Sequence, residues 1–360
     1  MNQKGTLSRL LDNLLEYDQV KSGETPVRII AVANKKELRK KVEEHIKDYI
    51  DPYHNKMDIM LYSYSWFEKI KEKLKKHGLN DFSLIEPSCY SNVRNLCLLS
   101  VIDTGCRFGI FLDDDELVEN ESYFKIAEEG LFESANDDGI IYGKAGYYNQ
   151  YRPSYRRFWE LKWWPKDATF NKVFEKLKSN KPHFKASMVA LGGNMVLSDE
   201  IIRNVCFDPS VSRGEDMDYL FNARLFGYRI YFDPFLHVKH LPPENKTPVW
   251  KKAREDIYRF LYLREKYRQH LKSFEVQKIA FEEFLPYPGV FMKDDLEERI
   301  FEHNKLLATK YLSEDDKLGF KMSMENAKIP FIYKKPQKVI EKLITNIKTW
   351  RKITGIIGER

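Results

Sequence analysis

Two spacings of apolar residues alternate along the first third of the chain. Short apolar runs occupy residues 27–33, 57–63, 82–86 and 108–112. Between them, apolar positions recur every three or four residues in segments 35–49, 66–77 and 90–103. The short runs are typical of buried strands and the longer segments of amphipathic helices. Strands that alternate with helices predict right-handed crossovers, and therefore an α/β fold with a mostly parallel sheet flanked by helices.

The second half of the chain has a less regular pattern. Strands are expected at residues 139–143 and 228–233 and after the paired glycines 192–193, and helices at 122–130, 198–205 and from residue 215. Residues 144–185 have broken periodicity and are rich in aromatic side chains, among them Tyr147, Tyr148, Tyr151, Tyr155, Phe158, Trp159, Trp163, Trp164 and Phe170. Two interpretations are open. The aromatic residues form a local core, or they form a mobile lid whose rings stack on sugars.

The two ends of the chain have helical patterns of their own. Residues 5–20 place leucines at helical spacing, which predicts a docking helix ahead of the main domain. At the other end, apolar residues recur every three or four positions from Val339 to Ile353, with lysine and arginine between them. Such a pattern is typical of a helix lying on an anionic membrane surface, with Trp350 at headgroup depth. The alternative is that this stripe packs on the protein body or on a second copy in a homodimer.

Charge and composition narrow the possible functions. The net charge is +6, and residues 331–360 hold eight basic and two acidic residues, so the tail carries the whole excess. A nucleic-acid-binding protein would carry positive charge across its fold, so we expect no nucleic-acid partner. The N-terminus lacks an apolar leader, no run is long enough to span a membrane, and the four cysteines form no C-x-x-C pair. We therefore expect a cytoplasmic protein with reduced thiols.

The strongest candidate for chemistry is the acidic triplet after the fourth apolar run. Residues 108–112 end directly at Asp113, Asp114 and Asp115. Carboxylates packed this closely raise one another's pKa unless a cation lies among them. At the carboxyl end of a strand, where ligands bind in open α/β sheets, the triplet predicts a site for Mn²⁺ or Mg²⁺. The alternative is an acidic turn that only caps the following helix.

Five motifs in order make the chain resemble the GT-A nucleotide-sugar glycosyltransferases, in particular family 2. They are Arg94-Asn95, Asp113-Asp114-Asp115, Gly192-Gly193-Asn194, Gly214-Glu215-Asp216 and a late histidine, His237 or His240. The resemblance covers residues 25–245. It implies a GT-A, Rossmann-like catalytic domain at 25–245, made of a nucleotide-binding half (25–118) and an acceptor half (119–245). An N-terminal docking helix (1–24) and a helical C-terminal region (246–360) flank this domain.

The resemblance also implies roles for individual residues. Asp115 and a late histidine, His240 in preference to His237, would hold the metal ion, with Asp113 contacting the ion's water or the ribose. Asp216 would be the base that takes the acceptor proton, and Glu215 would bind a sugar. The donor would be a GDP- or UDP-hexose and the acceptor a hydroxyl group, and the donor contacts would come from Ala33, Arg94, Asn95, Asp113, Asp114, Gly193 and Asn194.

Some features depart from the family pattern and keep several hypotheses open. The second apolar run ends Leu61-Tyr62-Ser63-Tyr64, without the acid that helps to read the nucleobase, and the first ends at Ala33 without the frequent Pro or Thr. Inversion at the sugar is favoured over the retaining chemistry of mannosyl- or glucosylglycerate synthases. A non-catalytic sugar-binding module and a metal-dependent nucleotidyltransferase or phosphohydrolase also fit acids at the edge of a sheet. The absence of a glycine-rich phosphate loop after the first strand disfavours the nucleotidyltransferase.

Overall fold

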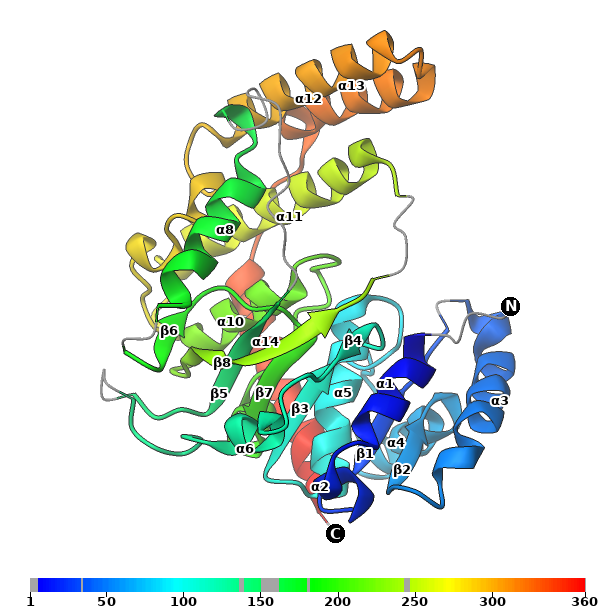
Figure 1. The fold of residues 1–360 in the computed structure, drawn as a ribbon. Helices are drawn as coiled ribbons and strands as arrows, with labels where there is room; N and C mark the ends of the chain where they lie inside the picture. Colours follow the sequence, from blue (N-terminus) through cyan, green and yellow to red (C-terminus); the bar gives the residue numbers. More distant parts are fainter. Residues whose placement is uncertain are drawn as a thin grey trace.

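The structure is a computed structural model that describes residues 6–33, 35–135, 139–149, 162–179, 182–242 and 247–359. It begins with two short helices, α1 (Thr6–Leu14) and α2 (Asp18–Lys21). Strand β1 (Val27–Ile30), helix α3 (Arg39–Ile50), strand β2 (Ile59–Tyr62) and helix α4 (Tyr64–Lys76) follow. Strands β1 and β2 pair in parallel as a two-stranded sheet (Figure 1). The α–β alternation expected for this part is therefore confirmed, with the N-terminal helix split in two.

The strand expected at residues 82–86 is absent, because this segment forms turns in the described structure. Its apolar residues Leu84 and Ile85 are buried, which explains the strand-like pattern. However, its backbone carbonyls accept hydrogen bonds from side chains of helix α5 (Tyr90–Thr104) and not from a neighbouring strand. The Asn95 amide donates to the Leu84 carbonyl at 2.9 Å and the Asn92 amide to the Ser83 carbonyl at 3.1 Å.

The central sheet has six described strands. They are β3 (Phe108–Leu112), β4 (Glu116–Leu117), β5 (Gly143–Tyr148), β6 (Lys185–Ser187), β7 (Asn194–Ser198) and β8 (Ile230–His240). Their order is β3-β7-β5-β8-β4, and β6 also pairs with β8. The α/β class and the central sheet flanked by helices are confirmed (Figure 1).

The prediction that the sheet is mostly parallel is wrong. Only β5 and β8 run parallel among the described pairs of this sheet, and the others are antiparallel. The physical reason is that strands consecutive in sequence are not neighbours. Strand β7 enters between β3 and β5 from the opposite direction, so the helical segments do not serve as crossovers between adjacent parallel strands.

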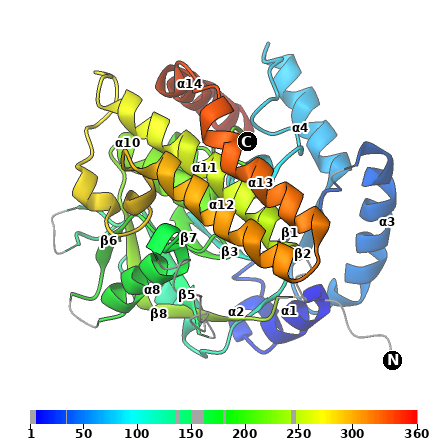
Figure 2. The ribbon, with the colours of Figure 1, turned by 90° about the horizontal axis from the view of Figure 1, so that it is seen from above.

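The remaining helices cover the sheet and extend beyond it. They are α6 (Tyr123–Glu128), α8 (Lys166–Leu177), α9 (Asp199–Asn204), α10 (Glu215–Leu225), α11 (Val249–His270), α12 (Leu296–Ser313), α13 (Lys317–Ile332) and α14 (Val339–Gly358). Short 3-10 helices occur at Lys36–Leu38, Asp51–Tyr53, Phe281–Phe284 and Gly289–Phe291. Helices α11, α12 and α13 lie side by side when seen from above, and α12 and α13 form a hairpin at one end of the molecule (Figures 1 and 2).

The described parts of residues 144–185 are more regular than expected. Strand β5 extends to Tyr148, helix α8 occupies Lys166–Leu177, and β6 starts at Lys185. Trp164 is 2% exposed and packs on Phe260 and Phe291, so this part of the aromatic set forms core. The aromatic residues at 151–161 lie outside the described residues, and the lid remains a prediction.

Helix α14 packs its apolar stripe on the body of the protein. It contacts α4, α5, α9 and α11, and the side chains of Ile347, Trp350 and Ile353 are buried. Trp350 is fully buried and its indole N–H donates to the Ile202 carbonyl at 2.7 Å. The prediction that Trp350 reaches a membrane headgroup layer is therefore wrong, and packing on the body is confirmed. Among the described helices none is long and apolar enough to cross a bilayer.

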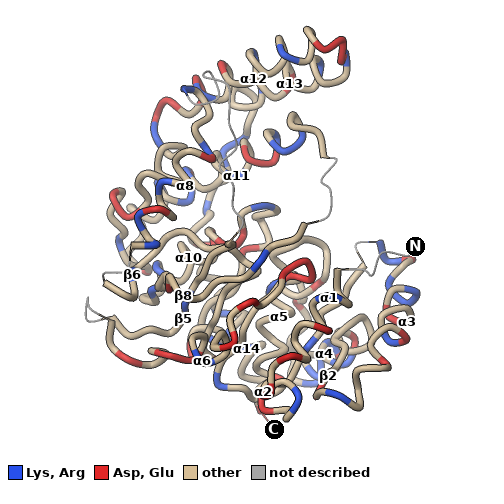
Figure 3. Tube along the Cα trace, viewed as in Figure 1, with Lys and Arg blue, Asp and Glu red and all other residues tan. Residues whose placement is uncertain are grey.

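Basic and acidic residues are interspersed along the chain, as in the α12–α13 hairpin (Figure 3). All four cysteines are free thiols.

Candidate active site

The turn between β3 and β4 positions the acidic triplet. Strand β3 ends at Leu112, and the Asp113 N–H donates to the Glu116 carboxyl at 2.9 Å, which closes the turn. Strand β4 then pairs with the far end of β8, with Glu116 opposite His240. This register brings the triplet, which follows the fourth apolar run, beside a histidine about 125 residues further along the sequence.

Asp115 and His240 form the closest acid–histidine contact of the predicted metal residues. The Asp115 Oδ2 and His240 Nε2 atoms are 3.4 Å apart. The contact with His240 lowers the pKa of Asp115, although its partial burial opposes the shift. The Tyr148 ring stacks on the His240 imidazole with centroids 4.4 Å apart. The imidazole is thus held beside the carboxylate, with Asp115 16% and His240 31% exposed.

Asp113 is paired with Arg94 from helix α5. The Arg94 Nη2 donates to Asp113 Oδ1 at 2.8 Å, and Arg94 Nε lies 4.0 Å from a Glu215 carboxylate oxygen. Arg94 therefore connects the acidic triplet to the start of α10. Gly192 makes this path possible, because a Cβ at residue 192 would lie 2.9 Å from Arg94 Nη2.

Behind the turn, the carboxyl group of Glu116 is fully buried. Burial, and next the charge of Asp113, raise the pKa of Glu116 to about 9, so the group is a neutral acid at pH 7. It occupies the space next to Gly193, where a Cβ would lie 2.0 Å from Glu116 Oε1. The two glycines of the 192–194 motif thus make room for two different side chains of the site.

Glu215 and Asp216 open helix α10 behind Gly214, whose φ of +71° suits glycine. The Asp216 carboxylate accepts from the Gly192 N–H at 3.2 Å and from the Met217 N–H at 2.8 Å. Burial raises the pKa of Asp216, and burial together with the charge of Asp216 raises the pKa of Glu215 to about 7. One of these neighbouring carboxyls can therefore hold a proton near neutral pH.

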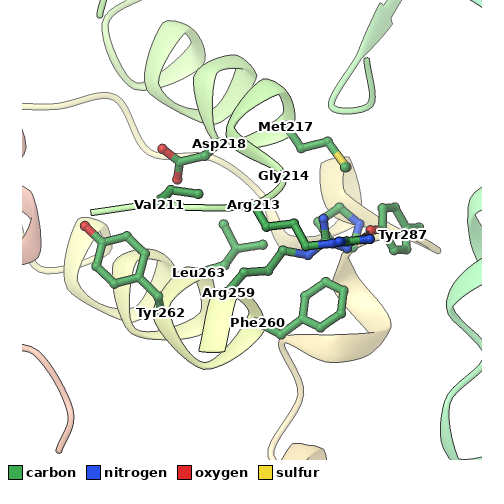
Figure 4. A pocket seen from close by; sticks show the side chains of 11 residues that line it. Val211, Arg213, Gly214, Met217, Asp218, Arg259, Phe260, Tyr262, Leu263 and Tyr287 are labelled. Atoms are coloured by element: carbon green, nitrogen blue, oxygen red, sulfur yellow. Dashed lines mark hydrogen bonds between the residues drawn. The ribbon is translucent and has the colours of Figure 1, made fainter. Parts of the chain in front are cut away.

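A cavity of about 300 Å³ adjoins this acid pair. Its walls come from α8, from the start of α10, from α11 and from the loop at Tyr287. They comprise Lys166, Asp167, Phe170, Arg213, Gly214, Glu215, Asp216, Met217, Arg259 and Tyr287. A smaller cavity beside it shares Arg213, Arg259 and Tyr287, which are drawn in Figure 4.

Several predicted donor contacts are corrected by the structure. Asn95 is fully buried and uses its amide on the Leu84 and Phe207 backbones, so it cannot reach a ligand. Asn194 is likewise buried, bonding the Tyr147 and Leu236 carbonyls and the Tyr123 hydroxyl. In both cases the amide satisfies buried backbone groups, which is a structural task that a motif cannot distinguish from binding.

The other predicted residues are placed as follows. Asp114 accepts a hydrogen bond from Thr6 of helix α1. His237 contacts the Asn149 side chain at 2.8 Å, and burial lowers its pKa. Ala33 follows β1 and is half-buried, whereas Asn34 lies outside the described residues. Of the two late histidines, the geometry therefore favours His240.

Sequence reasoning missed the cations of the cavity. Lys166 lies on α8, Arg213 just before α10 and Arg259 on α11, and they meet only through the fold. No motif or spacing joins them. The sequence shows that Glu116 directly follows the acidic triplet, but it does not show that the Glu116 side chain is buried.

The residues can accommodate a divalent ion in part. Among the described residues no group of three or more His, Cys, Asp or Glu side chains could hold a metal. Asp115 and His240 alone offer an oxygen and a nitrogen 3.4 Å apart. Adjacent ligands at 2.0–2.1 Å from an octahedral ion lie roughly 3 Å apart, and Mg²⁺ usually takes one or two protein groups plus substrate phosphates. The pair therefore fits an ion that is completed by a diphosphate.

Comparisons with known proteins give structural similarity only. No protein-family model matches the chain, and no curated protein sequence matches it significantly. The structure is similar to a mannosyltransferase from Pyrobaculum calidifontis in complex with GDP-Man and Mn²⁺, with 12% identity, 99% of this chain and 82% of that chain covered, and a TM-score of 0.47. It is also similar to GalNAc-T7 with UDP, GalNAc and Mn²⁺, with 13% identity, 89% and 56% covered, and a TM-score of 0.36. The functional interpretation rests on the side-chain geometry above.

Proposed function

We propose that this protein is a metal-dependent glycosyltransferase that moves a hexose from a GDP- or UDP-sugar to a hydroxyl acceptor. The observation that carries the proposal is the position of Glu215 and Asp216. On one side they contact Arg94 and Gly192, next to the acidic triplet, and on the other they line the 300 Å³ cavity. A donor at the triplet and an acceptor in the cavity would therefore meet at this acid pair.

The donor side would be held by charge. Asp115 and His240 would bind Mn²⁺ or Mg²⁺, and Asp113 would contact an ion-bound water or the ribose. The ion would supply positive charge to the leaving diphosphate. Arg94, which already balances Asp113, is placed to stabilise the same negative charge as it develops.

Asp216 would act as the base. The acceptor hydroxyl oxygen attacks the anomeric carbon, and its proton passes to the Asp216 carboxylate. The bond from that carbon to the diphosphate oxygen breaks, and its electron pair leaves with the diphosphate. Attack from the opposite face inverts the anomeric configuration. Two backbone N–H groups orient the Asp216 carboxylate, and its raised pKa makes it a better proton acceptor than an ordinary aspartate. Glu215 would bind a hydroxyl of the sugar.

The test is to incubate the protein with Mn²⁺ and a panel of GDP- and UDP-hexoses, and to measure released nucleoside diphosphate with and without candidate acceptors. Release that requires metal and is lost in Asp216→Asn is expected. NMR of the product should show inversion of the anomeric centre.

Binding of a sugar nucleotide without any release would identify a non-catalytic module. Release with retention of configuration would assign retaining chemistry and remove the base role of Asp216. Absence of both binding and release over the panel would overturn the proposed function.

A further inference from the structure

Three cations from separate parts of the chain converge on one wall of the 300 Å³ cavity. Lys166 Nζ lies 2.6 Å from Asp256 Oδ2, and Arg213 Nε and Arg259 Nη2 each lie 3.3 Å from Asp256 Oδ1. Asp256 is 3% exposed and sits behind all three. We call Lys166, Arg213 and Arg259 the cationic wall.

The cationic wall has more donors than its acids can use. A guanidinium has five N–H groups and a lysine ammonium has three. Asp256 is shared by all three cations, and Glu255 takes one further bond from Arg213 at 2.8 Å. Arg259 also donates to the Tyr287 hydroxyl at 2.5 Å, while its buried Nε has no hydrogen-bond partner among the described residues. Three positive charges are thus balanced by two acids, one of which lies at the surface.

Glu215, Asp216 and Asp167 line the same cavity as the cationic wall. Together with Asp256 and Glu255 they make five carboxyl groups around the three cations. Burial raises the pKa of Asp216 and raises that of Glu215 to about 7, so the pair carries less than its full negative charge at neutral pH. The positive charge of the two arginines does not titrate there. The cavity therefore combines fixed positive charge with a proton-accepting acid pair.

Part of the cavity lining is apolar. Phe170 and Tyr287 pack edge to face with centroids 5.2 Å apart, and Met217 completes this side. Figure 4 shows Arg213, Arg259 and Tyr287 gathered at one place beside the start of α10. Flat apolar surface next to polar groups suits the face of a sugar ring.

We propose that this cavity is the acceptor subsite and that the acceptor is a hydroxyl compound carrying an oxyanion, a phosphate or a carboxylate. The cationic wall would bind the oxyanion, and the acceptor hydroxyl would lie at Glu215 and Asp216. The assignment of this cavity as an acceptor subsite rests on the proposed function. The anion-binding site itself does not depend on that function.

The experiment uses three ligands that share one ring. Glucose 6-phosphate, glucuronate and glucose differ at a single carbon, which carries a phosphate, a carboxylate or a neutral hydroxyl group. Their affinity for the full-length protein is measured by calorimetry at fixed ionic strength, for the wild type, Arg213→Gln, Arg213→Lys and Arg268→Gln. Arg268 is the matched control, because it lies on the same helix as Arg259, is 36% exposed like Arg213, and pairs with Glu265 and Asp294 outside the cavity.

At least one of the two anionic sugars should bind the wild type about 10- to 100-fold more tightly than glucose, the advantage of charge-assisted hydrogen bonds. The better of the two identifies the oxyanion. Arg213→Gln should lose most of this advantage, Arg213→Lys should keep part of it because the charge remains, and Arg268→Gln should behave as the wild type. Arg213→Lys also keeps the test valid if the Gln variant does not fold.

Equal affinity for glucose and both anions, or an anion preference that survives in both Arg213 variants, would overturn the anion subsite and leave a structural ion cluster. Anion binding that depends on Arg213 in a protein that turns over no sugar nucleotide would support the subsite and overturn the proposed function instead. Turnover with neutral acceptors only, without anion binding, would support the proposed function and overturn the anion subsite.

Discussion

The carboxylate of Asp115 lies 3.4 Å from the imidazole of His240, across the antiparallel pairing of β4 with β8. The next residue, Glu116, is directly opposite His240 in the ladder, so the contact is fixed by strand register and not by a flexible loop. Two potential ligands of different chemistry are therefore held at a spacing that one divalent ion can bridge.

Removing either ligand should weaken metal binding. We expect Asp115→Asn and His240→Gln to weaken Mn²⁺ binding by at least about tenfold, because even the outer partners of metal ligands are worth that much in metal affinity. Mn²⁺ titration followed by electron paramagnetic resonance, with and without nucleoside diphosphate, measures it. His237→Gln is the control and should bind Mn²⁺ as the wild type does. Unchanged Mn²⁺ affinity in both ligand variants would place the ion elsewhere.

Asp216→Asn should lower kcat by roughly 10²- to 10⁴-fold, the usual contribution of a general base. Donor affinity should be nearly unchanged, since the asparagine oxygen can still accept from one of the two backbone N–H groups, of Gly192 or Met217, that hold the Asp216 carboxylate, and the base acts on the acceptor proton. Single-turnover transfer and donor titration separate the two quantities. A variant that keeps more than a tenth of wild-type kcat would remove Asp216 from proton transfer and direct attention to Glu215.

Glu215→Gln should stabilise the protein increasingly as pH rises. Burial raises the pKa of Glu215 from 4.5 to about 7, so the folded state favours the protonated acid. The stability this provides is complete below pH 4.5 and is lost as pH rises through about 7. By pH 8 the wild type should have lost roughly 3 kcal/mol that a glutamine does not lose.

The free energy of unfolding, measured by denaturant titration at pH 5, 6, 7 and 8, tests this difference. Glu298→Gln, at a position on α12 away from the cavity, should track the wild type. A difference between Glu215→Gln and wild type that is independent of pH would contradict the raised pKa.

Gly193→Ala should strongly destabilise the protein, because the added Cβ would clash with the Glu116 side chain. The added Cβ would lie 2.0 Å from Glu116 Oε1, and Glu116 is fully buried with its other oxygen accepting from the Asp113 N–H. Overpacking of this kind costs about 1–3 kcal/mol. In the Glu116→Ala background the same substitution should cost at least about 1 kcal/mol less, since the clashing atom is gone. A double-mutant cycle of unfolding free energies gives the coupling, and additive effects would disprove the contact.

Trp350→Ala should cost roughly 3–5 kcal/mol of stability, as for other large buried side chains. Trp350→Phe should cost less, because it keeps most of the ring and loses the hydrogen bond to Ile202. Lys352→Ala, on the exposed side of the same helix, should change stability by no more than about 0.5 kcal/mol. Thermal and denaturant unfolding compare the three. A Trp350→Ala protein as stable as the wild type would mean that α14 does not dock in solution.

Local patterns predicted elements whose partners are nearby in sequence. Helix α5 and strand β3 have the expected bounds to within one residue, because their burial shows directly in apolar spacing. The segment at 82–86 has the same apolar signal but no strand, since its hydrogen bonds go to two asparagines of α5. The pattern of apolar residues indicates which residues are buried. It does not indicate which groups form hydrogen bonds with the backbone.

The residues of the candidate site likewise fall into those that a local sequence pattern indicates and those that depend on the fold. The acids at 113–115 and 215–216 carry a local signal, whereas the roles of Asn95 and Asn194 depend on which carbonyls surround them. Lys166, Arg213 and Arg259 have no signal in sequence, because only the packing of α8 and α11 around Asp256 brings them together.

Helix α14 also determines the order in which the fold can be completed. It covers α4, α5 and α9, and Lys73 of α4 bonds the Ile357 carbonyl across 284 residues of chain at 3.3 Å. During synthesis the apolar faces of α4 and α5 are exposed long before α14 is available to bury them. Contacts this distant in sequence slow folding, and exposed apolar surface in the waiting chain favours aggregation. We therefore expect the apolar faces of α4 and α5 to stay open to aggregation in the nascent chain until α14 has been synthesised and can pack on them.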